Sequence, residues 1–257
     1  MFSALDLSGK VGVVIGGTSG IGRTLSLGLA DAGANVVATG RNAANVEEVA
    51  REIEARGKRT LRVTTDTRDT SSLQRLLAAC LERFEKVEIL INCAAKIKRA
   101  PTVDFPAADW NDILETNLTG TLRACQVFGK HMLSRKYGRI INIASLSSFV
   151  GLHEVAAYAA SKAGVAALTR ALAVEWSREG VLTNAIAPGV FRTALNAELL
   201  DDTPRGNEFL MRTPLGRFGE LKELVGAAVF LASDSASFVT GQILVVDGGF
   251  LASGVNQ

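Results

Sequence analysis

The sequence predicts one α/β domain, in which a mainly parallel, doubly wound sheet of about seven strands carries helices on both faces. Short runs of aliphatic and β-branched residues alternate along the chain with longer segments of helical periodicity, as is typical of parallel sheets joined by crossover helices. The chain has 257 residues and is 47% hydrophobic, which is enough for a sizeable core. It contains no evident linker and no tandem repeat, so we expect residues 1–257 to form a single domain.

The composition excludes several classes of protein. No run of 18 or more apolar residues occurs, so we expect no membrane span. Residues 1–10 lack the basic start and apolar stretch of a signal peptide, which favours a cytoplasmic protein. The net charge of +2 gives no electrostatic footprint for nucleic acid. Cys80, Cys93 and Cys125 lack metal-binding spacing, so we expect no metal site and reduced, mostly buried thiols.

A glycine-rich turn follows the first expected strand, Val11–Ile15, and precedes a helical pattern that ends near Gly33. Glycines in this context let the backbone approach a pyrophosphate, and the N-terminus of the helix favours its negative charge. The alternative is a plain tight turn, which the order of strand, turn and helix disfavours. The expected dinucleotide contacts in this turn are Gly16, Thr18, Ser19, Gly20, Ile21 and Gly22.

The end of the second expected strand, Asn35–Thr39, is the place where a cofactor ribose would be recognised. A free 2′-hydroxyl favours an acidic residue there, whereas a 2′-phosphate favours Arg. No Asp or Glu occurs between positions 35 and 46, so Arg41, with Asn42 beside it, favours NADP(H). NAD(H) remains possible if Arg41 only closes the loop.

The remaining elements follow from the same periodicities. We expect helices at residues 43–56, 71–84, 107–135, 155–178 and 221–231, and strands at residues 60–65, 87–91, 140–144, 182–186 and 243–246. Residues 191–217 are the least regular stretch, and long excursions of this kind are often lids.

Ser145, Tyr158 and Lys162 form the candidate catalytic group. Tyr158 and Lys162 are four residues apart and therefore share one face of a helix, and Ser145 stands at the carboxyl end of a strand, where open α/β sheets bind ligands. A free phenol has a pKa of about 10, and a nearby cation lowers that pKa by stabilising the phenolate. The group can therefore deliver a proton to a substrate oxygen held by the Ser145 hydroxyl. Alone, the Tyr-x-x-x-Lys spacing would indicate only a helix pair.

These features together resemble the short-chain dehydrogenase/reductase family over essentially the whole chain. The resemblance implies a Rossmann-type fold and hydride transfer between NADP(H) and a carbonyl or secondary alcohol. It also implies that the helices at residues 107–135 and 155–178 pair across two-fold axes, so we expect a homotetramer. The residues that carry the resemblance are Gly16, Gly20, Ile21, Gly22, Asn92, Cys93, Ala94, Ala95, Asn117, Ser145, Tyr158, Lys162, Pro188 and Gly189.

The resemblance also implies roles for single residues. Asn117 would disturb its helix and hold a water that relays protons, Lys162 would bind the nicotinamide ribose, and Thr193 would hold the nicotinamide end. Asp66 would approach the adenine ring, or else it caps the following helix, for which Thr70 is also available. The other implied cofactor contacts are Thr67, Asn92, Ala94, Tyr158, Pro188 and Gly189.

Arg99 and His153 are the candidate substrate contacts. Arg99 follows the strand at residues 87–91, should face the crevice, and can bind a carboxylate through two hydrogen bonds. His153 lies in a loop that borders the substrate pocket in the family. The stretch Phe191-Arg192-Thr193-x-Leu195-Asn196 resembles sugar-acid dehydrogenases of the gluconate 5-dehydrogenase type, so a sugar acid or polyol is the favoured substrate.

Two other functions remain open. The first is a 3-oxoacyl-carrier-protein reductase, in which Arg135, Lys136 and Arg178 would dock an acidic carrier protein. The same three cations also lie near helix ends, where they favour the helix dipole. The second is a regulator that binds the cofactor without turnover, and the complete set of Asn, Ser, Tyr and Lys disfavours it.

Overall fold

Six parallel strands form one sheet in the order β2-β1-β3-β4-β5-β6. The computed structural model describes residues 3–193 and 196–254. The strands are β1 (Val11–Ile15), β2 (Asn35–Thr39), β3 (Ile89–Asn92), β4 (Gly138–Ile143), β5 (Val181–Pro188) and β6 (Ile243–Val246). The α-helices are α1 (Gly20–Asp31), α2 (Ala43–Ala55), α3 (Thr70–Phe84), α4 (Ala107–Leu114), α5 (Gly120–Ser134), α6 (Ala156–Trp176), α7 (Ala197–Leu200), α8 (Pro204–Arg212) and α9 (Val225–Ala232). The predicted doubly wound α/β class is confirmed.

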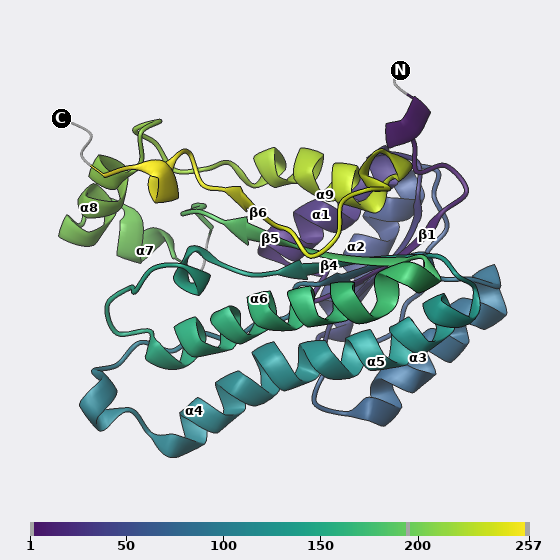
Figure 1. The fold of residues 1–257 in the computed structure, drawn as a ribbon, viewed down its shortest axis with the longest axis horizontal. Helices are drawn as coiled ribbons and strands as arrows, with labels where there is room; N and C mark the ends of the chain where they lie inside the picture. The colour runs from purple at the N-terminus through teal and green to yellow at the C-terminus, as the bar shows by residue number, and fades with distance from the viewer. Residues whose placement is uncertain (1–2, 194–195, 255–257) are drawn as a thin grey trace.

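Helices cover both faces of the sheet (Figure 1). α1, α2 and α9 pack on one face in a core that includes Leu29 and Ile53, and α3, α5 and α6 pack on the other in a core that includes Phe128. Every residue of β1, β3, β4 and β5 is buried, because a sheet covered on both faces needs strands that are apolar throughout. Of the helices described, none is long and apolar enough to cross a membrane.

The sheet contains six strands in the described ranges rather than about seven, because residues 60–65 form no ladder. This segment is attached to the end of β2 at separate points. The Thr65 backbone amide donates to the Gly40 carbonyl at 2.9 Å, and the Thr39 hydroxyl donates to the Val63 carbonyl at 2.5 Å. The expectation of a third strand at residues 60–65 is therefore wrong, although its threonine-rich, β-branched composition favours a strand.

The helix expected at residues 107–135 consists of three successive segments. α4 passes into a π-helical turn at Glu115–Thr119, which in turn passes into α5. Such turns are rare and frequently mark functional sites. Asn117 lies at the centre of this one, so the expected disturbance of the helix is present.

The carboxyl ends of the strands bring the candidate residues to one edge of the sheet. β1 leads into Gly16, β3 into Cys93, β4 through one residue into Ser145, and β5 into Gly189. The order of strands reverses between β1 and β3, which are neighbours. Open α/β sheets bind ligands at such a switch point.

Candidate functional site

The turn between β1 and α1 is built for close approach of the backbone. Gly16 has a φ of +77°, and a Cβ there would lie 2.5 Å from the Ala94 backbone nitrogen. A Cβ on Gly22 would collide with the Gly16 carbonyl oxygen. Both positions therefore require glycine, and the turn leaves the N-terminus of α1 open, with Ser19 and Gly20 exposed. An anion can be bound by the free amides of such a helix N-terminus.

The other expected contacts in this turn differ in accessibility. Ser19 is the N-cap of α1, but its side chain makes no capping hydrogen bond. Thr18 is half-buried, and its hydroxyl lies against Gly40 at the end of β2. Ile21 packs against the core on the α1 face of the sheet. We infer that Ile21 supports the turn by packing.

Arg41 stands free at the end of β2. Its side chain is exposed and forms no hydrogen bond or ion pair with any described residue. Asn42 caps α2, where its Oδ1 accepts from the Asn45 backbone amide at 3.2 Å. Thr39 is fully buried, and its hydroxyl donates a hydrogen bond to the Val63 carbonyl. Arg41 is therefore the cation at this position that remains available to a phosphate.

Asp66 is occupied by a neighbouring arginine. Hydrogen bonds from Arg68 are the main reason that the pKa of Asp66 is lowered to about 2, and the charge of Arg41 acts in the same direction. The cap of α3 is Asp69, which accepts from the Ser71 amide, so the expectation that Asp66 or Thr70 caps this helix is wrong. Thr67 is buried against Gly120.

Ser145, Tyr158 and Lys162 converge beside the carboxyl end of β4. Ser145 Oγ accepts from the Ser147 backbone amide at 3.2 Å, and Lys162 Nζ donates to the Ile143 carbonyl at 2.6 Å. The Lys162 ammonium lies 5.7 Å from the centroid of the Tyr158 ring. The helix spacing and the strand end thus bring together the three side chains that the sequence placed there.

Burial controls the protonation of this group. It raises the pKa of the Tyr158 phenol, and a hydrogen bond with Ser145 opposes the rise. It also lowers the pKa of Lys162 to about 8, because only 2% of this residue is exposed. In this state the phenol is therefore held protonated, whereas the sequence led us to expect a lowered Tyr158 pKa. The ammonium is bound to a backbone carbonyl, and its distance from the ring leaves desolvation as the stronger effect.

Asn117 is fully buried and links two elements of the site. Its side chain bonds both polar groups of the Lys96 peptide: Oδ1 accepts from the amide at 2.7 Å, and Nδ2 donates to the carbonyl at 2.9 Å. Nδ2 also donates to Ser161 Oγ at 3.0 Å, and Ser161 donates to the Tyr158 carbonyl. Asn117 therefore fixes the loop after β3 against the tyrosine helix α6. The sequence offered no signal for the part played by Ser161.

Asn92 and Ala94 lie at the end of β3 in different environments. Asn92 Nδ2 donates to Asn142 Oδ1 at 2.9 Å and to Cys125 Sγ at 3.3 Å, so its amide joins β3, β4 and α5 inside the fold. Its Oδ1 is buried without a partner. The Ala94 backbone packs directly against Gly16. Ala94 thus lies beside the glycine turn, whereas Asn92 connects β3 to β4 and α5 inside the fold.

Pro188, Gly189 and Thr193 follow β5. Gly189 packs against Asp247, where a Cβ would lie 2.5 Å from the Asp247 Cα, and its amide donates to the Val246 carbonyl at 2.8 Å. The Thr193 amide and hydroxyl both donate to Asn196 Oδ1, at 2.7 and 3.2 Å. Leu195, part of the stretch that suggested sugar-acid dehydrogenases, lies outside the described residues.

Of the two expected substrate contacts, Arg99 already forms an ion pair with a carboxylate of the protein, whereas His153 is mostly exposed. Arg99 forms an ion pair with Glu154 at 3.0 Å, and 80% of the His153 side chain is exposed. Glu154 has a φ of +63°, a region that non-glycine residues rarely adopt. Lys96 and Lys98 lie in the same loop as Arg99 and form ion pairs with Asp112 and Asp109. We call this loop, together with His153 and Glu154, the substrate rim.

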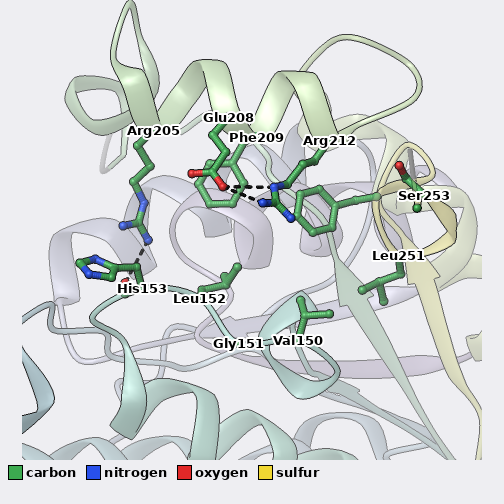
Figure 2. Close-up of a pocket in the computed structure, with 12 residues that line it drawn as sticks. Val150, Gly151, Leu152, His153, Arg205, Glu208, Phe209, Arg212, Leu251 and Ser253 are labelled. Carbon is green, nitrogen blue, oxygen red and sulfur yellow. Dashed lines mark hydrogen bonds and ion pairs between the residues drawn. The ribbon is translucent and has the colours of Figure 1, made fainter. Parts of the chain in front are cut away.

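A cavity of about 380 Å³ lies beside this rim (Figure 2). It is bounded by the loop at residues 150–153, by one face of α8 and by the segment that follows β6. The loop at residues 150–153 begins five positions after Ser145. Ser145, Tyr158 and Lys162 do not line the cavity. Nowhere in residues 3–193 and 196–254 do three His, Cys, Asp or Glu side chains gather as a metal site would require.

Comparisons with known proteins find relatives that match along nearly the whole chain. A family model described as enoyl-(acyl carrier protein) reductase matches residues 15–251. The chain is 40% identical over 248 residues to gluconate 5-dehydrogenase of Gluconobacter oxydans, covering 96% of this chain and 97% of that protein. It is 39% identical over 253 residues to 2-dehydro-3-deoxy-D-gluconate 5-dehydrogenase of Escherichia coli K12, covering 98% and 99%.

A solved structure shares the architecture. The crystal structure of a gluconate 5-dehydrogenase from Burkholderia cenocepacia, in complex with NADP and tartrate, superimposes with a TM-score of 0.94 at 36% identity. The match covers 98% of this chain and 99% of that one.

Proposed function

Because the chain belongs to the short-chain dehydrogenase/reductase family, we propose that it transfers hydride between NADP(H) and a secondary alcohol or ketone of a sugar acid. The observation that carries this proposal is the convergence of Ser145, Tyr158 and Lys162 beside a glycine cradle. Relatives that align along nearly the whole chain include several sugar-acid dehydrogenases, and a gluconate 5-dehydrogenase among the similar structures was crystallised with NADP.

The residues present fit a dinucleotide with a 2′-phosphate. Gly16 and Gly22 have no space for a side chain, because the Ala94 backbone and the Gly16 carbonyl oxygen lie against them, and the tight turn leaves the N-terminus of α1 open for the pyrophosphate. Arg41 supplies an unpaired guanidinium at the position that recognises the ribose. Ala94, Gly189 and Thr193 border the same crevice and are proposed to hold the nicotinamide half. NADPH, when bound, supplies the hydride.

Tyr158 is the proposed acid in the reductive direction. The Ser145 hydroxyl holds the substrate oxygen, and the phenol donates its proton to that oxygen as the carbonyl carbon is reduced. A phenol whose pKa is raised is protonated at neutral pH and ready for this step. In the oxidative direction the same oxygen must lose a proton to Tyr158, and the ammonium of Lys162 stabilises the resulting phenolate.

Lys162 and Asn117 are proposed to maintain the proton supply. Lys162, whose pKa is lowered to about 8, can exchange protons near neutral pH more readily than an ordinary lysine. Asn117 holds the loop at Lys96 against α6, and its proposed role is to support a water that leads to the Lys162 ammonium. Arg99 and His153 are the proposed contacts at the substrate rim, Arg99 for a carboxylate.

The carrier-protein alternative is less well supported. Tyr158 lies near the start of α6, and Arg178 follows the end of that helix, about 30 Å away at 1.5 Å per residue. Arg135 and Lys136 precede β4, at the amino-terminal edge of the sheet. A carrier docked on these three cations would therefore sit at the opposite edge from Ser145.

The test is a substrate panel followed by NADPH absorbance. D-Gluconate and 2-dehydro-3-deoxy-D-gluconate represent sugar acids, sorbitol a neutral polyol, and an acetoacetyl thioester the carrier-protein reading. We expect oxidation of a sugar acid with NADP⁺, at a kcat/KM at least tenfold above that for sorbitol. Preference for the thioester would establish the alternative, and no turnover of any substrate would favour a cofactor-binding regulator.

We also propose that residues 1–257 form a single domain, that the protein is cytoplasmic, and that it assembles as a homotetramer. One sheet with two helical layers supports the first proposal. Exposed apolar side chains support the proposed homotetramer, and one of them is Val174 on α6.

A further inference from the structure

The cavity between α8 and the loop at residues 150–153 holds an arginine that lacks a carboxylate partner. Arg205 is half-buried and extends from α8 toward the loop (Figure 2). Its Nη2 donates to the His153 carbonyl at 3.2 Å, and its guanidinium lies 5.6 Å from the centroid of the Phe209 ring. Its Nε is buried without a hydrogen-bond partner, and no carboxylate in the described ranges forms an ion pair with it.

The other cations around this cavity are already neutralised or turned away. Arg212, almost two turns further along α8, forms an ion pair with Glu208 at 3.0 Å. Arg99, in the loop after β3, forms its ion pair with Glu154. The imidazole of His153 is largely exposed. A buried donor without a partner costs free energy, so Arg205 is the group here that gains most from an anion.

The local charge is unbalanced by one unit. Burial is the main cause that lowers the pKa of Arg205, repulsion from Arg99 adds to it, and the charges of Glu154 and Glu208 oppose it. Arg99, Arg205 and Arg212 thus carry three positive charges against the two carboxylates of Glu154 and Glu208. One further carboxylate would neutralise the group.

We propose that Arg205 binds the carboxylate of the substrate, which is thereby held between α8 and the rim that carries Arg99. The planar fork of a guanidinium can give two parallel hydrogen bonds to a carboxylate, and Arg205 Nε would then have an acceptor. The ligand class is a hydroxy acid whose carboxylate lies at the end remote from the carbon that reacts beside Ser145. This inference rests on the proposed sugar-acid function and adds a residue from α8 to it.

The first test compares acidic and neutral substrates. Arg205→Gln should raise the KM for D-gluconate about tenfold and change the KM for sorbitol less than twofold, because a charge-assisted hydrogen bond is lost only with the acid. Arg205→Lys keeps the charge without the fork and should fall between the two. Arg212→Gln is the matched control, since it removes an arginine from the same helix and cavity that already has its own carboxylate; its effect should stay below threefold.

The second test does not depend on turnover. L-Tartrate, a dicarboxylate, is titrated calorimetrically into the protein saturated with NADPH, and Arg205→Gln should weaken its binding about tenfold while the melting temperature remains that of the wild type. If D-gluconate is not oxidised, the proposed function fails, but a loss of tartrate affinity confined to the Arg205 variants still supports the anion site. The inference is overturned by a wild-type protein that does not bind tartrate, by equal KM changes for acid and polyol, or by an Arg212→Gln effect as large as that of Arg205→Gln.

Discussion

Tyr158 is the side chain on which the proposed chemistry depends, and a single-atom change isolates it. Tyr158→Phe removes the phenol oxygen and keeps the ring that packs near Lys162. We expect turnover to fall by more than a hundredfold while NADPH binds within threefold of the wild type, because general acid catalysis typically contributes 10²–10⁴-fold. Stopped-flow kinetics and fluorescence titration of NADPH measure the two quantities.

A retained rate above a tenth of the wild type would show that Tyr158 is not the acid. The chain offers a matched control in its other tyrosine, Tyr137, whose hydroxyl bonds Lys10 and Asp234. Tyr137→Phe removes the same atom from a residue that precedes β4, at the opposite end of that strand from Ser145, and should leave kcat within twofold.

Arg41 tests the recognition of the cofactor phosphate. Arg41→Ala removes a guanidinium that has no other described partner, so the change should not disturb the fold. A charge-assisted contact contributes about 1.5–3 kcal/mol, which corresponds to roughly a ten- to hundredfold preference for NADPH over NADH. The variant should lose most of that preference through weaker NADPH binding, with the Kd for NADH little changed. Wild-type protein that binds both cofactors equally would contradict this reading.

Lys162 gives a pH dependence whose sign follows from its burial. Its pKa is lowered from 10.5 to about 8 on folding, so between these values the unfolded chain binds more protons than the folded one. Stability attributable to Lys162 therefore rises with pH from about 8 to 10.5. Relative to Lys162→Met, the unfolding free energy of the cofactor-free wild type should increase by about 2 kcal/mol between pH 7 and pH 10. Urea denaturation at both pH values checks this; a constant difference would mean that Lys162 titrates normally.

At the scale of elements, the π turn at Glu115–Thr119 predicts a large cost for a small change. Asn117→Ala would leave the polar groups of the half-buried Lys96 peptide without their partners, at about 1–3 kcal/mol for each group that water cannot reach. We expect a loss of 2–4 kcal/mol in urea denaturation together with a fall in kcat. Asn111→Ala, an exposed asparagine on neighbouring α4, is the control and should cost less than 0.5 kcal/mol.

Elements were predictable where one local pattern dominated. Val11–Ile15 and Asn35–Thr39 are strands as predicted, because each is an apolar, β-branched run. Residues 60–65 are also rich in β-branched residues but are attached to the end of β2 through the Thr39 side chain, which no local pattern reveals. The apolar periodicity of residues 107–135 continues through Asn117, so the π turn could be anticipated only from family resemblance.

At the scale of the whole molecule, the proposed tetramer makes a prediction about mass. Light scattering at micromolar concentration should give four times the chain mass of 27.1 kDa. Val174, 85% exposed on α6, is proposed to lie in the helix-pairing interface, so Val174→Glu should reduce the assembly to dimers.

Val103 serves as the matched control for this experiment. It is 90% exposed and lies in a short turn before α4, outside the proposed helix pair. Val103→Glu should leave the mass unchanged. A monomer mass for the wild type would refute the tetramer.

The site as a whole was predictable only where its members are linked by spacing. Tyr158 and Lys162 lie one helical turn apart on α6, and Gly16 and Gly22 belong to the turn that leads into α1, so spacing along the chain was enough to place each pair in one element. Arg99 and its partner Glu154 are 55 positions apart, and Arg205 meets the His153 carbonyl from 52 positions away. Such pairings depend on the packing of distant segments, so the engagement of Arg99 and the cavity beside α8 emerged from the structure alone.

The all-parallel order of the sheet also has a kinetic consequence. Neighbouring parallel strands require long crossovers, and across the β5–β6 pair Asn184 bonds Gln242 over 58 positions. To form such a pair, the chain must lose the conformational entropy of a large loop before the stabilising contacts between the strands are made, which makes folding slow. Before β6 pairs with it, β5 forms the edge of the sheet, although all of its residues are buried in the folded protein. A folding intermediate of this kind exposes an unpaired strand edge to which other chains can bind, so it is prone to aggregation. How long this state lasts depends on how quickly the segment that contains α7, α8 and α9 folds and brings β6 into place.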